Sequence, residues 1–536
     1  MSDTGFFRLA TADPDRDVLV TPDGTVLTAG ELHALANRIA NGLQAIGLQP
    51  DDTLALVLPN GAEMIASYLA GTQIGLYVTP INHHLVAPEI AYIVGDSDAK
   101  ALIGHERYAG ELAKVLEELR AGEGAPTWSG DDAPPAYLVT SGSDGDISGF
   151  RPFEELVAGQ PDTPPANRVA GAPMHYTSGT TGKPKGVKRG RVDMDPDDLF
   201  SLYGLFLSLF GVQPHDGHVH ITGSPLYHTA VLLWTSNSLH LGHKVVLMDK
   251  WDAQEMLRLI DEHKVTTSHM VPTQLHRLLA LPEEVRARYD CSSTRCMVHA
   301  AAPCPPEVKR RMIEWWGDSI MEYYAATEGG GTIVTAKEWL ERPGTVGRAW
   351  AGAEIRIYDD AGQRLGPGEI GTVYMGLAQA TFEYKGDEQK TRNNRIYEPD
   401  GSAFFTVGDV GELDEDGYLF LRDRKIDMII SGGVNIYPAE IESEFLTHPK
   451  VGDVAVFGVP HPDWGEAVMA VVEPAAGVEP GPELEEELRS FARERLASYK
   501  RPATIEFTTE MPRDPSGKLY KRKLRDPHWE GIQRSI

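Results

Sequence analysis

A short stretch rich in glycine, hydroxyl and lysine side chains is the part of the sequence best suited to chemistry. It runs from Tyr176 to Val187 and holds almost nothing that could fill a hydrophobic core. Its glycines let the backbone curl so that several N–H groups point into one concavity, while hydroxyls and ammonium groups add donors and positive charge. The stretch therefore predicts a phosphate-binding loop. The expected contacts come from Thr177, Ser178, Gly179, Thr180, Thr181, Gly182 and Lys183.

Two other kinds of segment have a similar composition, namely the common nucleoside-triphosphatase loop and a flexible linker. The stretch is not the common nucleoside-triphosphatase loop, because two residues separate Gly179 from Gly182 where that motif needs four. A flexible surface linker is the ordinary meaning of a Gly/Ser/Thr run. Lys183, Pro184 and Lys185 argue against plain flexibility and favour the phosphate loop.

The overall composition limits the kinds of partner. A chain of 536 residues is too long for one ordinary core and predicts about two to four structural units. Its 41% hydrophobic and 24% charged residues are typical of a soluble globular protein. With 50 basic and 78 acidic residues the formal charge is −28, which repels nucleic acid and anionic membranes. Any anionic ligand would need a local basic patch.

Cysteine usage and the terminal sequence favour a cytoplasmic protein. Cys291, Cys296 and Cys304 are odd in number and lack metal-ligand spacing, so reduced thiols are expected. The N-terminus has no basic region followed by an apolar run, so no export signal is predicted. The most apolar stretch, near Tyr203 to Phe210, is too short to span a bilayer.

The residues before the loop alternate between helical and strand patterns. Thr28 and Glu31 form a capping-box pattern, and apolar residues then repeat at helical spacing up to Gly47. A buried strand is expected from Thr53 to Leu58 and is followed by Pro59-Asn60-Gly61, with the next helix from Glu63 to Ile74. This alternation predicts a parallel sheet with helices on its faces. Residues 122–170 form a connection rich in Pro, Gly, Asp and Ser.

A second alternating series follows the loop. Its strands are expected at His218–Thr222, Lys244–Met248, Thr266–Met270, Arg295–Ala300 and Ser319–Tyr323, and the last of these closes the series. Its helices are expected at Thr229–Leu241, after Asp252, from Pro272 and at Pro305–Trp316. Doubly wound sheets bind ligands at the carboxyl ends of their strands. The residues there are Ser224–His228, Ala301–Pro303 and Tyr324–Glu328.

The last third of the chain changes character twice. From Arg348 to Leu421, short β-like runs between glycine turns predict a small barrel or distorted sheet. From about Lys425, strands and a helix from Leu484 to Leu496 suffice for a separate α+β domain. The predicted fold is α/β, with a large N-terminal domain, residues 1–424, of doubly wound sheets plus a small β-barrel-like part, and an α+β C-terminal domain, residues 425–536.

Several motifs, taken in order, resemble those of the adenylate-forming superfamily and its acyl-CoA synthetase branch. They are the Tyr176–Val187 loop, Tyr324–Glu328, Val407–Gly411, Gly417–Asp427, Ser431–Glu442 and Pro512–Leu519. The resemblance covers about Thr28 to Arg525. It implies an enzyme that uses ATP to convert a carboxylic acid to acyl-AMP with release of pyrophosphate, and then makes a CoA thioester. It also implies a mobile C-terminal domain.

The resemblance assigns roles in nucleotide binding. Tyr324 corresponds to the residue that stacks on adenine, and Thr327 and Glu328 correspond to the α-phosphate and magnesium contacts. Asp409 and Arg424 correspond to the ribose ligands. Ala300, Ala301 and Ala302 correspond to a backbone segment beside adenine that is usually richer in glycine in the family. Without the resemblance, Thr327-Glu328 would be a helix cap and Asp409 a turn residue.

The resemblance also assigns residues to the acid, to CoA and to the moving domain. Lys518 corresponds to the lysine that bridges the carboxylate and α-phosphate, and His228 to the residue beside the carboxylate. Gly432 and Gly433 correspond to the loop that lines the pantetheine tunnel. The hinge position, commonly Lys or Asp, is Ile426 here. The basic residues after Lys518, namely Lys521, Arg522, Lys523 and Arg525, are expected to be solvated surface.

The identity of the acid is less constrained. Gly329-Gly330-Gly331 lacks side chains where the acyl pocket should lie, which suggests room for a medium- or long-chain fatty acid or another bulky apolar acid. An aryl or sterol-derived acid is the next choice. Thr229–Trp234, Leu205–Phe210 and His299 would line this pocket in the family layout, although aromatic and histidine side chains on helices are more often core.

Other functions stay open at this point. An amine or a carrier-protein thiol could replace CoA as the acceptor, and a nucleotide-binding protein without catalysis is a third hypothesis. The expected partners are a small carboxylic acid, ATP, Mg²⁺ and CoA, with a homodimer as an open alternative and with neither nucleic acid nor a transmembrane segment.

Overall fold

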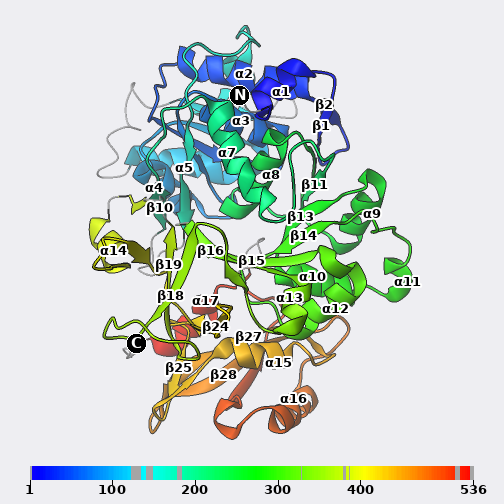
Figure 1. Ribbon diagram of the computed structural model, residues 1–536, viewed down its shortest axis with the longest axis vertical. Helices are drawn as coiled ribbons and strands as arrows, with labels where there is room; N and C mark the ends of the chain where they lie inside the picture. The colour runs from blue at the N-terminus through cyan, green and yellow to red at the C-terminus, as the bar shows by residue number, and fades with distance from the viewer. Residues whose placement is uncertain are drawn as a thin grey trace. The chain divides into compact units, whose positions relative to one another are not determined.

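The chain forms two compact units. The computed structural model describes residues 3–121, 135–139, 149–177, 184–326, 329–377, 382–385, 387–513 and 519–530. The first unit comprises Met1–His269, Glu284–Met297 and Ala380–Asn393, and the second comprises Met270–Glu283, Val298–Gln379 and Asn394–Ile536 (Figure 1). The predicted domain boundary at Arg424 falls inside the second unit and stays a prediction.

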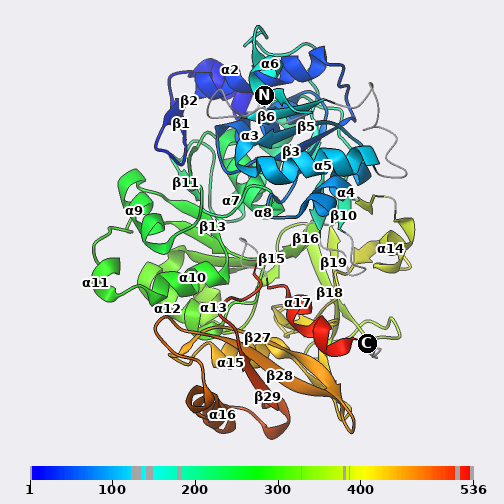
Figure 2. The same cartoon turned by 180° about the vertical axis from the view of Figure 1, so that it is seen from behind.

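One sheet of the first unit is wholly parallel and has helices on both faces. Its strand order is β7-β6-β5-β3-β4-β8. The strands are β3 (Thr53–Val57), β4 (Tyr77–Pro80), β5 (Ala99–His105), β6 (Ala136–Val139), β7 (Arg151–Pro152) and β8 (Ala172–Pro173). The helices that cover the sheet are α2 (Ala29–Ala45), α3 (Ala62–Gln73), α4 (Ala87–Asp96) and α5 (Ala109–Ala121), of which α3 and α5 are visible in Figure 2.

Side chains alternate along β3 as a doubly wound sheet requires. Leu54 and Leu56 belong to the core that includes α2 and α3, whereas Ala55 and Val57 belong to the core that includes α4 and α5. Every residue of β3 is buried. The near-continuous apolar run predicted this strand, because a strand covered on both faces has no solvent side.

A second sheet of this unit also follows the expected order of elements. Its strands in the first unit run β13-β11-β12-β1-β2, with β11 parallel to both of its neighbours. They are β1 (Asp17–Val20), β2 (Val26–Thr28), β11 (Val219–Thr222), β12 (Lys244–Leu247) and β13 (Thr267–Met270), with helices α7 (Pro196–Ser208), α8 (Thr229–His240) and α9 (Ala253–His263) between strands. The caps predicted at Thr28 and Asp252 are present, since each accepts a hydrogen bond from the backbone N–H three residues later.

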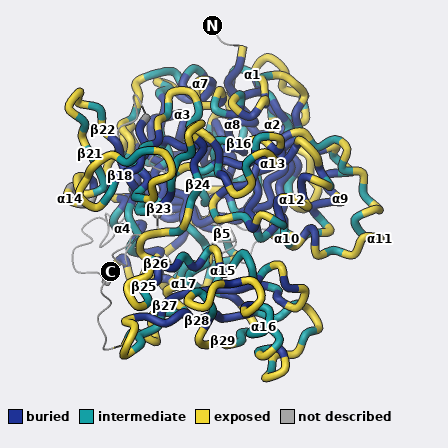
Figure 3. Tube along the Cα trace, turned by 60° about the horizontal axis from the view of Figure 1, so that its bottom comes forward, coloured by how far each residue is buried: buried dark blue, intermediate teal, exposed yellow. Residues whose placement is uncertain are grey.

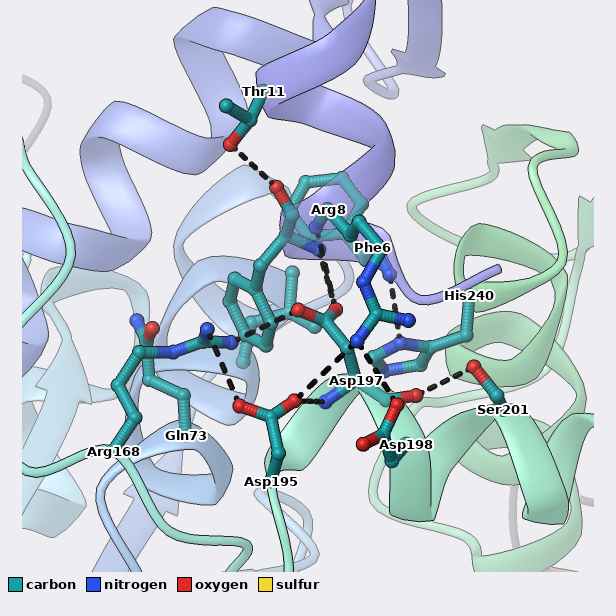
Figure 4. Close-up of polar contacts among 12 residues, drawn as sticks. Phe6, Arg8, Thr11, Gln73, Arg168, Asp195, Asp197, Asp198, Ser201 and His240 are labelled. Atoms are coloured by element: carbon teal, nitrogen blue, oxygen red, sulfur yellow. Dashed lines mark hydrogen bonds and ion pairs between the residues drawn. The ribbon is translucent and has the colours of Figure 1, made fainter. Parts of the chain in front are cut away.

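A buried carboxylate fixes the N-terminal helix α1 (Phe6–Ala12) to the rest of the first unit (Figure 4). Asp197 Oδ1 accepts from the backbone N–H of Phe7 at 3.0 Å, and its Oδ2 accepts from Arg168 at 3.2 Å. The side chain of Asp197 is only 4% exposed. The guanidinium of Arg168 also lies 4.8 Å from the centroid of the Phe7 ring. Segments almost two hundred residues apart are joined by this one charged group.

The segments on either side of the predicted phosphate loop form a β-hairpin. Strand β9 (His175–Thr177) pairs antiparallel with β10 (Lys185–Lys188), which pairs with β20 (Glu383–Tyr384). Thr177 lies opposite Lys185 in the register. The loop therefore connects two directly paired residues.

The second unit departs from the predicted end of the strand series. After β14 (Cys296–His299), α12 (Pro306–Trp316) and β15 (Ile320–Ala326), two further strands follow, β16 (Gly329–Thr335) and β17 (Arg348–Ala349). Both pair antiparallel. The prediction that the series closes at Tyr323 was wrong. Three consecutive glycines are typical of a turn, yet here they open a strand.

The region after β17 is a small antiparallel sheet, in agreement with the predicted distorted sheet. Its order is β21-β22-β19-β23-β24, with β18 also paired to β19. The strands are β18 (Ala353–Tyr358), β19 (Gly371–Leu377), β21 (Arg395–Tyr397), β22 (Ala403–Phe405), β23 (Asp409–Leu413) and β24 (Leu419–Arg424).

The C-terminal part of the second unit has its own sheet and core. Its strands are β25 (Ile429–Ser431), β26 (Val434–Ile436), β27 (Val451–His461), β28 (Gly465–Pro474) and β29 (Thr504–Phe507), with helices α10 (Pro272–Ala280), α15 (Pro438–Phe445), α16 (Pro482–Arg495) and α17 (Lys521–Arg525) elsewhere in the unit. Val456, Val472 and Leu488 are among its fully buried core residues. Figure 3 shows the buried course of β28 and the exposed side of α16.

The basic tail is not uniformly solvated, contrary to the prediction. Lys521 forms an ion pair with Glu442 at 2.8 Å, and Arg525 lies 3.4 Å from Asp427. The two basic side chains are 13% and 14% exposed. Burial raises the pKa of Glu442. Acidic residues of α15 and of the segment after β24 supply the partners that a local reading of the tail could not show.

The described residues contain neither a disulfide nor a helix suited to span a membrane. The three cysteines lie in this part of the chain and form no disulfide, and burial raises the pKa of the Cys296 and Cys304 thiols. Among the helices of the described ranges, none combines the length and apolar character needed to cross a membrane.

Candidate active site

Three of the residues assigned to the nucleotide converge in the second unit. The hydroxyl of Tyr324 donates to Asp409 Oδ2 at 2.5 Å, and Arg424 Nε lies 3.4 Å from Asp409 Oδ1. Asp409 begins β23 and lies directly opposite Arg424 at the end of β24. Asp409 is 7% exposed as a residue, whereas Arg424 is exposed. The site therefore combines a held carboxylate, an aromatic ring and a guanidinium that faces solvent.

This arrangement can recognise a ribose next to a flat base. A carboxylate accepts hydrogen bonds from vicinal hydroxyls, and an aromatic ring offers a stacking surface. Both oxygens of Asp409 already have a protein partner, which fixes the orientation of the carboxylate before any ligand arrives.

A buried ion pair lies behind Tyr324 on the same strand. Lys309 of α12 donates to Glu322 of β15 at 2.5 Å, and both side chains are at least 93% buried, with exposed fractions of 1% and 7%. His299 Nε2 lies 3.9 Å from the same carboxylate. Burial raises the pKa of Glu322, and Lys309 opposes this effect. The pair joins α12 to the strand that carries Tyr324.

Lys309 and Glu322 were not predicted from the sequence, and His299 was expected to line the acyl pocket. His299 is fully buried next to Glu322, which is a core environment. One signal was available. Glu322 interrupts the apolar run Ser319–Tyr323, and a charged residue in a buried strand requires a partner of opposite charge.

The alanine segment assigned to the adenine ring follows β14. Ala300 is buried, and Ala301 has a φ of 73°, in the left-handed region. This region costs a residue with a Cβ roughly 1 kcal/mol relative to glycine, which accords with the glycine-rich family counterpart. The backbone at Ala301 thus takes a shape that glycine would adopt without strain.

The glycines assigned to the acyl pocket do not leave free space at every position. A Cβ on Gly331 would lie 2.2 Å from the carbonyl oxygen of Tyr324 and 2.5 Å from the Trp350 ring. A Cβ on Gly330 would lie 3.0 Å from Met375 Cβ. Neighbouring atoms therefore fill the place of a side chain at Gly331, and they leave little room for one at Gly330. The acyl pocket expected at these glycines stays a prediction.

His228 lies in the first unit, at the start of α8. It is the N-cap residue of that helix, and its ring centroid lies 4.4 Å from that of Tyr227. Two buried histidines, His175 and His269, interact electrostatically with it. Burial, with a smaller effect from His228, lowers the pKa of each to about 4. His228 is therefore surrounded by neutral rings at neutral pH.

The rings predicted near the acid pack together in the same unit. Phe206 and Phe210 make edge contacts with Trp234, and His220 stacks on the same ring with the centroids 6.0 Å apart. Trp234 is fully buried. These side chains form an aromatic core around α8.

The flanks of the phosphate loop are held by side chains of the first unit. Tyr176 donates to Asp96 at 2.7 Å, and Lys185 lies 3.8 Å from Asp387. Of the loop itself, Thr177 is described only by its backbone, and Ser178, Gly179, Thr180, Thr181, Gly182 and Lys183 lie outside the described residues.

Three further predicted residues lie outside the described residues, namely Thr327, Glu328 and Lys518. Within the described ranges no cluster of three or more His, Cys, Asp and Glu residues could hold a metal ion. The magnesium role of Glu328 therefore stays a prediction.

Gly432 and Gly433 form the turn between β25 and β26. Their φ angles are 57° and 81°, and Ser431 pairs with Val434 on either side. A two-residue hairpin with two positive φ angles requires glycine or a similarly permissive residue. Both glycines are exposed, and their role in lining the pantetheine tunnel stays a prediction.

The chain matches two family models. Residues 6–384 match the AMP-binding enzyme family, and residues 440–518 match the AMP-binding enzyme C-terminal domain. Both matches lie in the order that the motifs predicted.

Relatives of known name are similar along almost their whole length. The chain is 32% identical to a long-chain-fatty-acid–CoA ligase of Mycobacterium tuberculosis, covering 97% of each. It is 31% identical to a fatty acid–acyl-carrier-protein ligase of Streptomyces coeruleorubidus, covering 96% of this chain and 94% of that protein. It resembles the crystal structure of ATP-bound MatB from Rhodopseudomonas palustris with a TM-score of 0.79 and 29% identity, over 99% of this chain and 100% of that one.

The family assignment rests on the two domain matches and on relatives that are similar over almost their whole length. The hydrogen bond between Tyr324 and Asp409 agrees with it. The chain belongs to the AMP-binding enzyme family and is an adenylate-forming ligase.

Proposed function

We propose that the protein activates a carboxylic acid with ATP and then transfers the acyl group to CoA. The observation that carries this proposal is the Tyr324–Asp409–Arg424 constellation, a ribose and base site built in advance. The names of the relatives support CoA or a carrier-protein thiol as the acceptor.

The first half-reaction joins two anions. A carboxylate oxygen attacks the α-phosphorus of ATP, an acyl–phosphate bond forms, and the bond to the pyrophosphate leaving group breaks. Asp409 and Arg424 hold the ribose, and Tyr324 stacks on the base. In this proposal the loop from Thr177 to Lys183 binds the β- and γ-phosphates, and Lys518 neutralises charge between the carboxylate and the α-phosphate. Glu328 would hold Mg²⁺, which neutralises phosphate charge when bound.

The second half-reaction replaces AMP by sulfur. The CoA thiol loses its proton, sulfur attacks the acyl carbon, and AMP leaves. A thiol with a pKa of about 8.5 supplies some thiolate at neutral pH without a dedicated base. Gly432 and Gly433 would line the path of the pantetheine arm.

The names of two relatives favour a medium- or long-chain fatty acid as the substrate. An aryl or sterol-derived acid is the alternative, and an amine acceptor would make the enzyme an amide synthetase. The cytoplasmic location and the homodimer remain predictions of the sequence.

A panel of carboxylic acids in a pyrophosphate-release assay tests this function. Fatty acids of graded length, aryl acids and a bile acid are compared with CoA, a carrier protein or an amine as the acceptor. We expect pyrophosphate release that depends on the acid and a CoA thioester as the product. Release without any acid dependence, or a product formed only with amines, would contradict the proposal.

The variant Lys518→Ala separates the half-reactions. We expect it to lose pyrophosphate release but to keep most of its thioester formation from preformed acyl-adenylate. Lys523→Ala, another lysine of the same tail, serves as the control. Equal loss in both steps would refute the role given to Lys518.

A further inference from the structure

A buried amide links the two large sheets of the first unit. Asn60 follows β3 of the wholly parallel sheet and is 6% exposed. Its Nδ2 donates to the carbonyl of Ser224 at 3.1 Å and to that of Met248 at 2.9 Å. Its Oδ1 accepts from the backbone N–H of Leu226 at 2.9 Å. Both N–H donors of this side chain and one of its two acceptor lone pairs are therefore used.

The partners of Asn60 lie just past two strands of the other sheet. Ser224 and Leu226 follow β11, and Met248 follows β12. The carboxyl ends of parallel strands are where sheets of this class bind ligands. The side chain of Asn60 therefore links the carboxyl ends of strands in the two sheets, and its partners in the second sheet are all backbone atoms.

The same loop is supported from a second side by aromatic contacts. The ring of Tyr227 meets the edge of His83 at 5.1 Å, and His83 stacks on Tyr108 at 4.5 Å with an interplanar angle of 13°. His83 follows β4 and Tyr108 follows β5, so both belong to the sheet that carries Asn60. Arg107 Nη1 adds an ion pair to Asp249, after β12, at 2.5 Å.

His228 depends on this loop for its position. It follows Tyr227 directly and is the N-cap of α8. Its backbone N–H donates to the carbonyl of Pro225 at 3.2 Å. The turn that Asn60 fixes at Leu226 therefore also fixes the backbone position from which the His228 side chain extends.

We infer that Asn60 is a positioning residue, which fixes the loop from Ser224 to His228 and thereby the place where the carboxylate of the substrate acid is bound. The inference rests on the proposed function, because it takes His228 as the residue beside that carboxylate. Asn60 acts only through the loop and touches no reacting atom.

The amide is required because donor and acceptor must come from one short side chain. An isosteric aspartate keeps the acceptor for Leu226 but presents negative charge to the carbonyls of Ser224 and Met248. A displacement of the loop by about 1 Å is enough to reduce a rate by up to about 100-fold. The acid should be affected more than ATP, because the loop carries no residue assigned to the nucleotide.

The decisive experiment compares Asn60→Asp with the matched variant Asn37→Asp. Asn37 is fully buried in the same unit, donates to the carbonyl of Asp162 at 2.8 Å and accepts from Gln73 at 3.2 Å. Both variants should lower the melting temperature. Only Asn60→Asp should raise the KM for the acid, by about 10-fold or more, with the KM for ATP changed by less than about twofold.

The pH profile gives a second readout. The carboxyl group of the Asn60→Asp variant faces carbonyl oxygens, which favours its protonated form, and a protonated carboxyl donates again. Its acid KM, relative to that of the wild type, should therefore improve as the pH falls from about 8 to about 6. A purely structural role would not produce this partial recovery.

Two further measurements cover the remaining outcomes. If Asn60→Asp does not fold, the variant His83→Leu replaces it, because this change removes the His83 ring beside Tyr227 and leaves Asn60 intact. It should raise the KM for the acid and leave the KM for ATP nearly unchanged. If the wild type activates no acid, the proposed function fails, while faster hydrogen exchange at 224–228 in Asn60→Asp than in Asn37→Asp would still support the positioning role. Equal changes in both KM values, or no difference from Asn37→Asp, would overturn the inference.

Discussion

Tyr324 donates its phenolic hydrogen to Asp409 across 2.5 Å, although 85 positions separate the two residues. The bond joins β15 to β23 and orients the carboxylate that the proposed function gives to the ribose. The ring proposed to stack on the base and the carboxylate proposed to bind the ribose are thereby held together, so a change at either residue should weaken nucleotide binding.

Removal of this hydroxyl should affect ATP selectively. We expect Tyr324→Phe to raise the KM for ATP by about 5- to 10-fold, the loss of roughly one hydrogen bond to a charged group, with the acid KM unchanged. Initial rates of pyrophosphate release measure this. The matched control is Tyr358→Phe, because Tyr358 also donates to a carboxylate, Glu398, within the same unit. Equal effects of the two changes would contradict the assignment.

The buried pair of Lys309 and Glu322 should be sensitive to the loss of one partner. Lys309→Met leaves a carboxylate buried without compensation, and we expect it to lower the free energy of unfolding by about 3–5 kcal/mol. The double change Lys309→Met with Glu322→Gln should recover most of that loss. Urea unfolding of the three proteins checks this. A loss below about 1 kcal/mol in the single variant would show that the pair is not buried as described.

The N-terminal helix should be released by a change at Asp197. We expect Asp197→Ala to expose residues 6–12 to hydrogen exchange and to destabilise the first unit by about 2–4 kcal/mol, because Arg168 and two backbone donors lose their acceptor. The neighbouring Asp198, whose side chain is 47% exposed and pairs with Arg8 at 2.9 Å, is the matched control. Asp198→Ala should have an effect below about 1 kcal/mol. Similar exchange in both variants would argue against the anchor.

Buried histidines should make the protein sensitive to acid. Burial lowers the pKa of His240 and His220 to about 3 and that of His175 to about 4, from an ordinary value of 6.5. Below pH 6.5 these histidines bind protons in the unfolded chain but stay neutral in the folded one. The free energy of unfolding therefore keeps its full value above pH 6.5 and decreases as the pH falls from there to the folded-state pKa. Each such group contributes about 1.4 kcal/mol per pH unit.

The slope of stability against pH gives the measurement. We expect His240→Gln to reduce that slope between about pH 6 and pH 4 by about 1.4 kcal/mol per pH unit, which corresponds to one proton. The reason is that the unfolded variant has one titrating ring fewer. Its amide oxygen can still accept from the Phe6 N–H, as the His240 ring does at 3.1 Å. A slope equal to that of the wild type would show that His240 is not excluded from protonation by burial.

Local chemistry made much of the fold readable from the sequence. The cap at Thr28, the apolar run of β3 and the cap at Asp252 depend on neighbours within a few residues, so their elements could be predicted. The order of motifs also predicted a shared nucleotide role for Tyr324, Asp409 and Arg424, and the structure brings these three side chains together. The strand β16 was missed because three glycines resemble a turn.

The three-dimensional arrangement decided what depends on distant partners. Spacing along the sequence does not show that Lys521 pairs with Glu442 or that Gly331 fits against Trp350. Nor does it show which carbonyls accept hydrogen bonds from Asn60. The physical reason is that burial and charge pairing are properties of neighbours in space, and the chain brings those neighbours together only when its sheets have formed.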